Sequence, residues 1–230
     1  MTGDLHGTFD IWKLTGRHFE ELGLGEDDYL IICGDFGLVW YFEDDERGDE
    51  DKKWLDWLEG KPWTTLFVDG NHENFDLLSG YPIEEWNGGQ VQRIRDNVVR
   101  LVRGQVFDIA GKTFFAMGGA YSHDIEYRTE GVSWWKVEVP SRKEREEAIA
   151  NLAAHDWKVD YVITHCGPTG AIPKPRISDP VFPDEYTDWL QTEIADKLQF
   201  KRWFFGHYHK DYNEGDAYRL LYYDFEEIKG

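Results

Sequence analysis

Four short apolar runs, each ending in a polar residue that can bind a metal, constrain the fold of this 230-residue chain more than any other feature. They are YLIICGD at 29–35, TTLFVDGNH at 64–72, DYVITH at 160–165 and RWFFGH at 202–207. Each has the length and apolar character of a buried strand that is followed by a loop. In open α/β sheets the ligand lies beyond the carboxyl ends of the strands, so these polar residues are the ones to examine for function.

Helical patterns separate these runs. Apolar residues recur at helical spacing over 9–22 and over 52–58. A helix at 141–157 begins with a capping box formed by Ser141 and Glu144, and another is expected from Thr187 to about Leu198. The acidic stretch 42–53 is interpreted as a solvated loop that enters a helix.

Further apolar runs complete the expected sheets. Residues 98–102, 105–110 and 113–119 are separated by Arg-Gly and Gly-Lys turns and are interpreted as consecutive antiparallel strands, with one more strand at 220–228. Strands that alternate with helices around such a meander predict an α/β protein in which two sheets pack together with helices outside. Residues 1–230 are treated as a single domain, because no composition break divides the chain.

The charge balance narrows the range of partners. The chain carries 45 acidic and 25 basic side chains, which gives a formal net charge of −20. Such a surface repels polyanions, and no long nucleic acid is expected as a partner. A phosphorylated substrate would also be repelled at long range unless the site holds a local positive centre, which bound dications can supply.

Neither a membrane span nor a secretory signal is visible in the sequence, so no membrane association and a cytoplasmic location are expected. The two cysteines, Cys33 and Cys166, make neither a disulfide framework nor a CxxC pair, which fits a reducing compartment. Both are interpreted as small buried residues without chemistry.

Five clusters of His, Asp and Asn follow expected strands: Asp4 with His6, Asp35, Asn71 with His72, His165, and His207 with His209. A single histidine after a strand is more often a surface or core residue than a ligand. Five of the eight histidines, however, fall in these clusters, next to glycines that allow a close approach of backbone and ligand. Zinc, manganese and iron favour imidazole and carboxylate ligands, so the clusters together indicate a metal centre.

The ordered series GDLHG, GDFG, GNHE, TH and GHYH, between residues 3 and 209, resembles the calcineurin-like metallophosphoesterase superfamily. The resemblance implies a four-layer α-β-β-α sandwich of two mixed sheets flanked by helices, with a dimetal site at the carboxyl ends of the strands. One metal would be held by Asp4, His6 and His209. The other would be held by Asn71, His165 and His207, with Asp35 as the bridge between the two.

The resemblance also implies a reaction. Two divalent or trivalent ions, which can be manganese, iron or zinc, would hold a bridging hydroxide that attacks phosphorus in line. Asp35 would take part as the bridging ligand, and His72 would contact the phosphate or protonate the leaving oxygen. The expected substrate is a phosphomonoester or phosphodiester of a small molecule or nucleotide.

Two features depart from the pattern of the superfamily. Many members carry an aspartate three residues after the bridging one, where it orients the catalytic histidine, but this chain has Leu38 there. Either Glu73 or Asp76 takes that role, or His72 is less finely positioned. Only three residues precede Asp4, so we expect a first strand that is truncated upstream of Asp4 or severely shortened.

Several alternatives stay open. Within the stretch 120–140, Arg128 and His123 are candidate substrate contacts, while ordinary packing and surface charge explain the same residues. The chain can also be a catalytically weak relative that acts as a metal-binding regulatory or interaction module. A phosphoprotein phosphatase is disfavoured, because the Asp-Arg-Gly of those enzymes is replaced by Leu38-Val39-Trp40. A nuclease would need basic grooves, which the net charge does not indicate.

Overall fold

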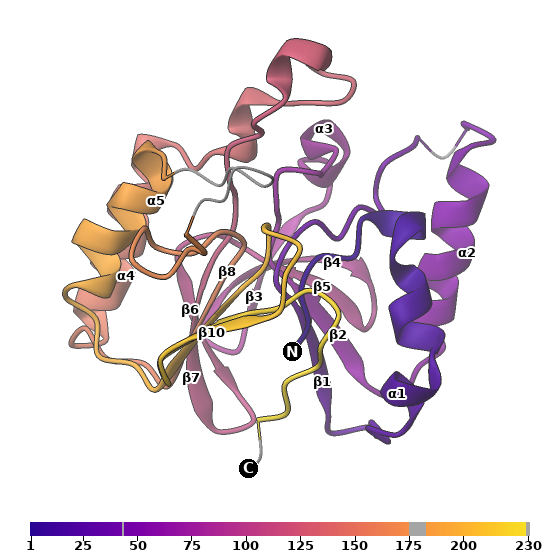
Figure 1. Cartoon of the computed structure of the whole chain (residues 1–230). Helices are drawn as coiled ribbons and strands as arrows, with labels where there is room; N and C mark the ends of the chain where they lie inside the picture. The colour runs from indigo at the N-terminus through magenta and orange to yellow at the C-terminus, as the bar shows by residue number, and fades with distance from the viewer. Residues whose placement is uncertain (43, 175–182, 229–230) are drawn as a thin grey trace.

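Two mixed β-sheets face each other at the centre of the protein, and helices cover their outer faces (Figure 1). The computed structural model describes residues 1–42, 44–174 and 183–228. Within these residues the first sheet has the strand order β1-β2-β5-β4-β3, and the second has the order β10-β11-β9-β8-β7-β6. The predicted α/β sandwich of two mixed sheets is therefore confirmed.

Parallel pairing brings the ends of the central strands together. In the first sheet β1 pairs with β2, and β2 with β5, in parallel; in the second sheet β7, β8, β9 and β11 form a parallel series. The strands of the first sheet are β1 (Tyr29–Ile32), β2 (Thr64–Phe67), β3 (Ile83–Trp86), β4 (Gly89–Arg95) and β5 (Val98–Leu101). Those of the second are β6 (Gln105–Ile109), β7 (Lys112–Met117), β8 (Tyr161–Thr164), β9 (Arg202–Phe205), β10 (Tyr212–Glu214) and β11 (Tyr218–Leu220).

Three apolar cores separate the four layers. Successive side chains of a strand point to opposite faces, so Leu30 and Ile32 of β1 pack in the outer core while Ile31 packs between the sheets. The outer core of the first sheet includes Leu55 and Leu58 of α2 (Gly48–Glu59). The outer core of the second sheet includes residues of α4 (Arg142–Ala154) and α5 (Glu185–Trp189).

The predicted C-terminal helices are confirmed. The N-terminus of α4 has the capping box expected from the sequence, because the Ser141 hydroxyl accepts from the Glu144 N–H while the Glu144 carboxylate accepts from the Ser141 N–H. The helix expected from Thr187 forms as α5, which continues into the π-helix η5 (Leu190–Ala195). Shorter elements are α3 (Phe75–Leu78), η3 (Ile125–Tyr127) and η4 (Lys136–Glu138).

The continuous helix expected at 9–22 is wrong. The segment forms three short turns, η1 (Gly7–Phe9), η2 (Ile11–Thr15) and α1 (Arg17–Glu20). Gly16 has extended backbone angles and interrupts the helix, and Asp10 adopts non-helical angles between the first two turns. The apolar spacing still serves packing, because Ile11, Leu14 and Phe19 are buried against the first sheet.

The meander expected at 98–119 is only partly correct. β6 and β7 pair antiparallel as predicted, but β5 belongs to the first sheet and β6 to the second. The chain crosses between the sheets at Arg103, whose buried guanidinium lies 2.6 Å from the carboxylate of Asp69 at the end of the first sheet. The hairpin of β3 and β4 was not predicted.

Two further segments differ from expectation. The last strand ends at Leu220, and the following residues run beside the start of the chain, where the Glu226 N–H donates to Met1 O at 2.9 Å. In the acidic stretch 42–53, residue 43 lies outside the described residues, and α2 already begins at Gly48. Among the described residues every helix is too short or too polar to traverse a lipid bilayer.

The chain reaches Asp4 along the edge of β1. Thr2 makes one isolated parallel bridge with Ile32, with its N–H donating to Ile31 O and its carbonyl accepting from Cys33 N–H. Asp4, which follows, is fully buried. The first polar cluster thus lies beside the end of β1, where Asp35 also lies.

Candidate metal centre

The polar residues that follow the parallel strands meet at one end of the two sheets. Asp35 follows β1, Asn71 follows β2, His165 directly follows β8 and His207 follows β9. All four strands run in parallel within their sheets, which explains why their carboxyl ends present these side chains to the same region. The placement expected from the sequence is therefore observed for all four.

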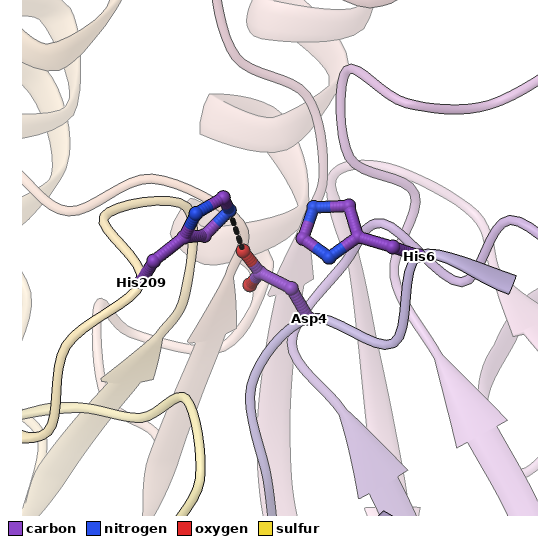
Figure 2. A group of neighbouring side chains, drawn as sticks. All are labelled: Asp4, His6 and His209. Atoms are coloured by element: carbon purple, nitrogen blue, oxygen red, sulfur yellow. Dashed lines mark ion pairs between the residues drawn. The ribbon is translucent and has the colours of Figure 1, made fainter. Parts of the chain in front are cut away.

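A first group consists of Asp4, His6 and His209, whose ligand atoms all lie within 4.8 Å of one another (Figure 2). His209 Nε2 lies 3.3 Å from Asp4 Oδ2. The Asp4 carboxylate also accepts from the His207 N–H at 2.9 Å, so the chain after β9 is tied to the chain before β1. These are the three residues that the motifs assign to one metal.

A second group is centred on His165, which is fully buried. His165 Nε2 lies 3.1 Å from Asn71 Oδ1, and the ring of His207 lies 5.0 Å from that of His165, centroid to centroid. These are the residues that the motifs assign to the other metal.

One oxygen of Asp35 connects the two groups. Asp35 Oδ2 lies 3.3 Å from His6 Nε2 and 3.3 Å from His165 Nε2. The other oxygen accepts from the His72 N–H at 2.7 Å. A carboxylate that faces one imidazole of each group has the placement required of a bridging ligand.

The backbone at the site is strained. Positive φ angles occur at His6, Asp35, His207 and His209, which are four of the eight non-glycine residues with this conformation in the described part of the chain. Such angles are costly for residues with a Cβ and tend to cluster at functional sites. The surrounding packing therefore holds the ligand loops in place before any ion binds.

Three motif glycines make room for the ligands. A Cβ on Gly34 would overlap the His165 imidazole, one on Gly70 would overlap the Asp35 carboxylate, and one on Gly206 would overlap Asp4. Each of these glycines precedes a candidate ligand of its own motif. The expectation that glycine permits a close approach at the clusters is confirmed.

The first group is supported by residues that the motifs did not indicate. Asp10 Oδ2 lies 2.8 Å from His6 Nδ1 and accepts a hydrogen bond from the Tyr222 hydroxyl at 3.2 Å. The Tyr222 ring stacks on His209, with centroids 4.8 Å apart. The buried Lys13 amine donates to the carbonyls of Asp4 and Tyr222. The i, i+4 spacing from His6 was a signal for Asp10, whereas nothing local marked Tyr222.

The second group is supported by buried partners. The Cys33 carbonyl lies 2.8 Å from His165 Nδ1, which leaves Nε2 directed at Asp35 and Asn71. Asn71 Nδ2 donates to Ser122 Oγ at 3.1 Å, and Ser122 Oγ in turn donates to the buried Glu138 carboxylate at 2.8 Å. The amide oxygen of Asn71 is thereby turned toward the site.

Buried carboxylates dominate the electrostatics of the site, because their negative charge favours the protonated form of the histidines around them. Burial alone would lower the pKa of His165, but the charge of Asp35 and the hydrogen bond to it raise the pKa to about 10. Burial is outweighed in the same way at His6, whose pKa rises to about 9. At His207, burial and the nearby charge of His165 lower the pKa to about 3.

The buried carboxylates and the imidazoles grouped around them fit metal ions. Without an ion, protons on His6 and His165 neutralise the charge of the buried Asp35, and a metal ion can replace those protons. The donor set of imidazole, carboxylate and amide oxygen suits manganese, iron and zinc alike.

His72 lies at the rim of this arrangement, with its ring 5.4 Å from that of His6, centroid to centroid. Arg128 approaches both ring nitrogens, with Nη1 3.2 Å from Nδ1 and Nη2 3.4 Å from Nε2. Burial, opposed by Asp35 and aided by Arg128, lowers the pKa of His72. The side chain that contacts the His72 ring is therefore the cationic guanidinium of Arg128.

The suggestion that Glu73 or Asp76 orients His72 is wrong. Glu73 accepts hydrogen bonds from the Phe36 and Gly37 N–H groups and so joins the loops that follow β1 and β2. Burial and the charge of Asp35 raise the pKa of Glu73 to about 8. Asp76 accepts from the Trp135 indole at 2.9 Å. Leu38, at the position of the usual aspartate, is a core residue of the first sheet.

The two candidate substrate contacts lie differently. Arg128 lines a cavity of about 570 Å³ together with His6, His72 and His209. Its guanidinium is held by Asp124 Oδ1 at 2.7 Å and by the Ser133 carbonyl at 3.1 Å. His123 is exposed and lies beside His207, with ring centroids 5.7 Å apart.

Comparison with known proteins places this arrangement among phosphoesterases. A family model described as calcineurin-like phosphoesterase matches residues 1–211. The lariat debranching enzyme of Drosophila melanogaster is 24% identical over 187 residues, covering 74% of this chain and 33% of that enzyme. The lariat debranching enzyme of Arabidopsis thaliana is 24% identical over 259 aligned residues, covering 97% of this chain and 59% of that enzyme. The chain thus spans about a third to three fifths of the length of these relatives.

Among solved structures, the phosphopantetheinyl hydrolase from Mycobacterium tuberculosis matches with 18% sequence identity and a TM-score of 0.39. The match covers 96% of this chain and 86% of that chain.

Proposed function

Because the chain belongs to the calcineurin-like phosphoesterase family, we propose that it hydrolyses a phosphomonoester or phosphodiester of a small molecule or nucleotide with two metal ions. In this proposal residues 1–230 act as one metallophosphoesterase domain, since the two sheets share the apolar core between them. The family uses a dinuclear metal site, which agrees with the two groups of ligands described above.

The observation that carries the proposal is the shared oxygen of Asp35, 3.3 Å from one imidazole of each group. We assign Asp4, His6 and His209 to the first metal and Asn71, His165 and His207 to the second, with Asp35 between them. When bound, such a metal pair activates water and stabilises charge on the phosphoryl oxygens.

The chain supplies the remaining groups. His72 is proposed to protonate the leaving oxygen, because its ring faces the first group from the rim of the site. Arg128 is proposed to bind a phosphoryl oxygen, since its guanidinium is held in place beside His72. A bound phosphate would bring negative charge to both residues and favour the protonated imidazole that a general acid requires. His123 is proposed to lie at the edge of the substrate.

A small substrate fits the charge around the site. Among the described residues that line the cavity, Arg128 is the one lysine or arginine, whereas Asp10 and Asp51 contribute acidic side chains. The net charge of −20 also disfavours binding of an extended polyanion. The metals and Arg128 would supply the local attraction for one phosphate.

The decisive experiment combines metal analysis with turnover. The protein is loaded in turn with manganese, iron and zinc, its metal content is measured, and hydrolysis of 4-nitrophenyl phosphate and of its bis ester is followed. Two bound metals together with hydrolysis of at least one ester is the expected result, and the relative rates separate monoesterase from diesterase action. Two bound metals without hydrolysis of either ester would instead favour a metal-binding regulatory module.

Lariat debranching is the second candidate function, because it is the named activity of the curated relatives. An enzyme that grips a long polyanion loses affinity steeply as salt rises, since the counterions released on binding must be taken up again. Turnover of a lariat substrate with a steep salt dependence of KM would favour this candidate over the small-molecule proposal.

A further inference from the structure

The cavity beside the first ligand group is larger than one phosphate requires. Its volume is about 570 Å³, which lies within the range of pockets that enclose a whole small ligand. His6 and His209 line it at the metal side, and His72 and Arg128 line it where the phosphate is proposed to bind. If phosphorus lies at that end, the organic part of the ester extends into the rest of the cavity.

Aromatic side chains form much of the remaining wall. Phe9, Trp40, Tyr41 and Tyr222 all line the cavity, and they come from three separate parts of the chain. Phe9 is 83% exposed, so a ligand that covered its ring would remove a large apolar surface from water. Walls of this kind favour a flat ring, which can stack on them, over an alkyl group of similar size.

One buried acid completes the lining. Asp51, in the first turn of α2, is 7% exposed and contributes to the cavity wall. Its Oδ2 accepts a hydrogen bond from the Trp40 N–H at 3.3 Å, and a carboxylate has capacity for more donors than one. A carboxylate repels phosphate, so it suits the end of the ligand that carries N–H donors.

Building on the hydrolase function proposed above, we infer that this cavity is a nucleobase site. The substrate class is then a phosphoester whose organic part is a nucleoside, with its base stacked among Phe9, Tyr41 and Tyr222 and an N–H of the base donated to Asp51. The phosphate of the same molecule reaches Arg128 and His72. The site thereby selects nucleotides over phosphoesters with alkyl groups.

The test uses three diesters that share one leaving group. The 4-nitrophenyl esters of thymidine 5′-monophosphate, phenyl phosphate and ethyl phosphate differ only in the group that remains on phosphorus. Stacking alone should favour the phenyl over the ethyl ester, and the thymidine ester should exceed the ethyl ester by about tenfold or more in kcat/KM. Equal kcat/KM for the thymidine and ethyl esters would overturn the inference.

Variants separate the base site from the chemistry. Phe9→Ala should lower kcat/KM several-fold for the thymidine ester and much less for the ethyl ester, whereas Phe42→Ala, which alters an exposed phenylalanine outside the cavity lining, should change neither. Asp51→Asn keeps the shape of the side chain and should reduce selectivity for the thymidine over the phenyl ester. Equal losses on all three esters in both cavity variants would count against a base site.

Failure of the hydrolase proposal would be visible separately. If none of the esters is hydrolysed by the metal-loaded protein, the proposed activity is wrong, and equilibrium binding then decides the inference. Thymidine 5′-monophosphate should still bind more tightly than ethyl phosphate, with Phe9→Ala reducing the difference. Equal affinity for the two ligands would reject the nucleobase site independently of turnover.

Discussion

The two halves of the proposed metal centre are built in different ways. The residues of the second half follow regular buried strands, and His165 is fully buried with its Nδ1 at a backbone carbonyl. In the first half, the side chain of His209 is 50% exposed, and His6 follows a segment with a single strand-like bridge. The strand framework positions one half, and a network of polar side chains positions the other.

The difference shows how a site can be completed where regular structure is scarce. Lys13 and Tyr222 hold the segments around Asp4 and His209 in place without a regular strand. Lys13 donates to the backbone carbonyls of Asp4 and Tyr222, and the Tyr222 ring stacks on His209. Tyr222 lies beyond residue 211, where the family match ends. We therefore expect the second half to bind its metal more tightly and the first half to depend on local partners.

The largest effect should come from removing the link between the halves. Asp35→Asn takes one negative charge from the oxygen that faces both groups, so both metals should be lost together. Turnover should fall by about a thousandfold, because metal charge stabilises the transition state by several kcal/mol. Metal analysis and far-ultraviolet circular dichroism of the purified variant check this, and retention of both metals in a folded variant would break the assignment of Asp35 as the bridge.

The next largest effect should leave both halves intact. His72→Ala removes the proposed acid, and kcat should fall by about a hundredfold, the lower end of general acid catalysis. Metal content should stay near that of the unaltered protein, since His72 holds neither ion in our assignment. A variant that loses metal would show that His72 is a ligand, in which case the first half extends further than proposed.

A matched pair of variants can separate the halves. Asp10→Ala removes the partner of His6, and Ser122→Ala removes the partner of Asn71. Each should weaken its own metal by about 10- to 100-fold, as loss of such a supporting contact does in other metal sites. Calorimetric titration of the metal-free variants measures the two affinities, and a loss at both sites in each variant would show that the halves act as one unit.

Acid pH should weaken metal binding in both halves through different groups. The pKa of His6 is about 9 and that of His165 about 10, so each must release a proton when its metal binds near pH 7. Affinity should rise by about tenfold per pH unit for each proton displaced, up to pH 9 for the first site and pH 10 for the second. His207, with a pKa of about 3, should contribute no slope in this range. Titrations in buffers of different ionisation enthalpy count the protons.

The sequence was most informative where local structure sets the position of a side chain. Asp35, Asn71, His165 and His207 follow apolar runs long enough to be strands, so their meeting at the sheet ends was predictable. The capping box at Ser141 is equally local, and it formed as expected. These cases need no knowledge of distant contacts.

The parts that could not be predicted depend on distant partners. The crossing between β5 and β6 depends on burial of Arg103 against Asp69, which no local pattern reveals. The same holds for Tyr222, whose hydroxyl reaches Asp10 across the whole length of the chain. Gly16 was the only sequence signal for the interruption of the expected helix at 9–22, and the prediction of that helix rested on the apolar spacing.

The motif glycines have a consequence for how such a gene can change. Gly34, Gly70 and Gly206 each belong to one motif but leave space for a ligand from another. A single nucleotide change that adds a methyl group at one of them therefore displaces a residue encoded far away, so the motifs are selected as a set. In a diverging lineage, replacement of one such glycine would therefore indicate a metal centre that no longer functions, even where every proposed ligand is retained.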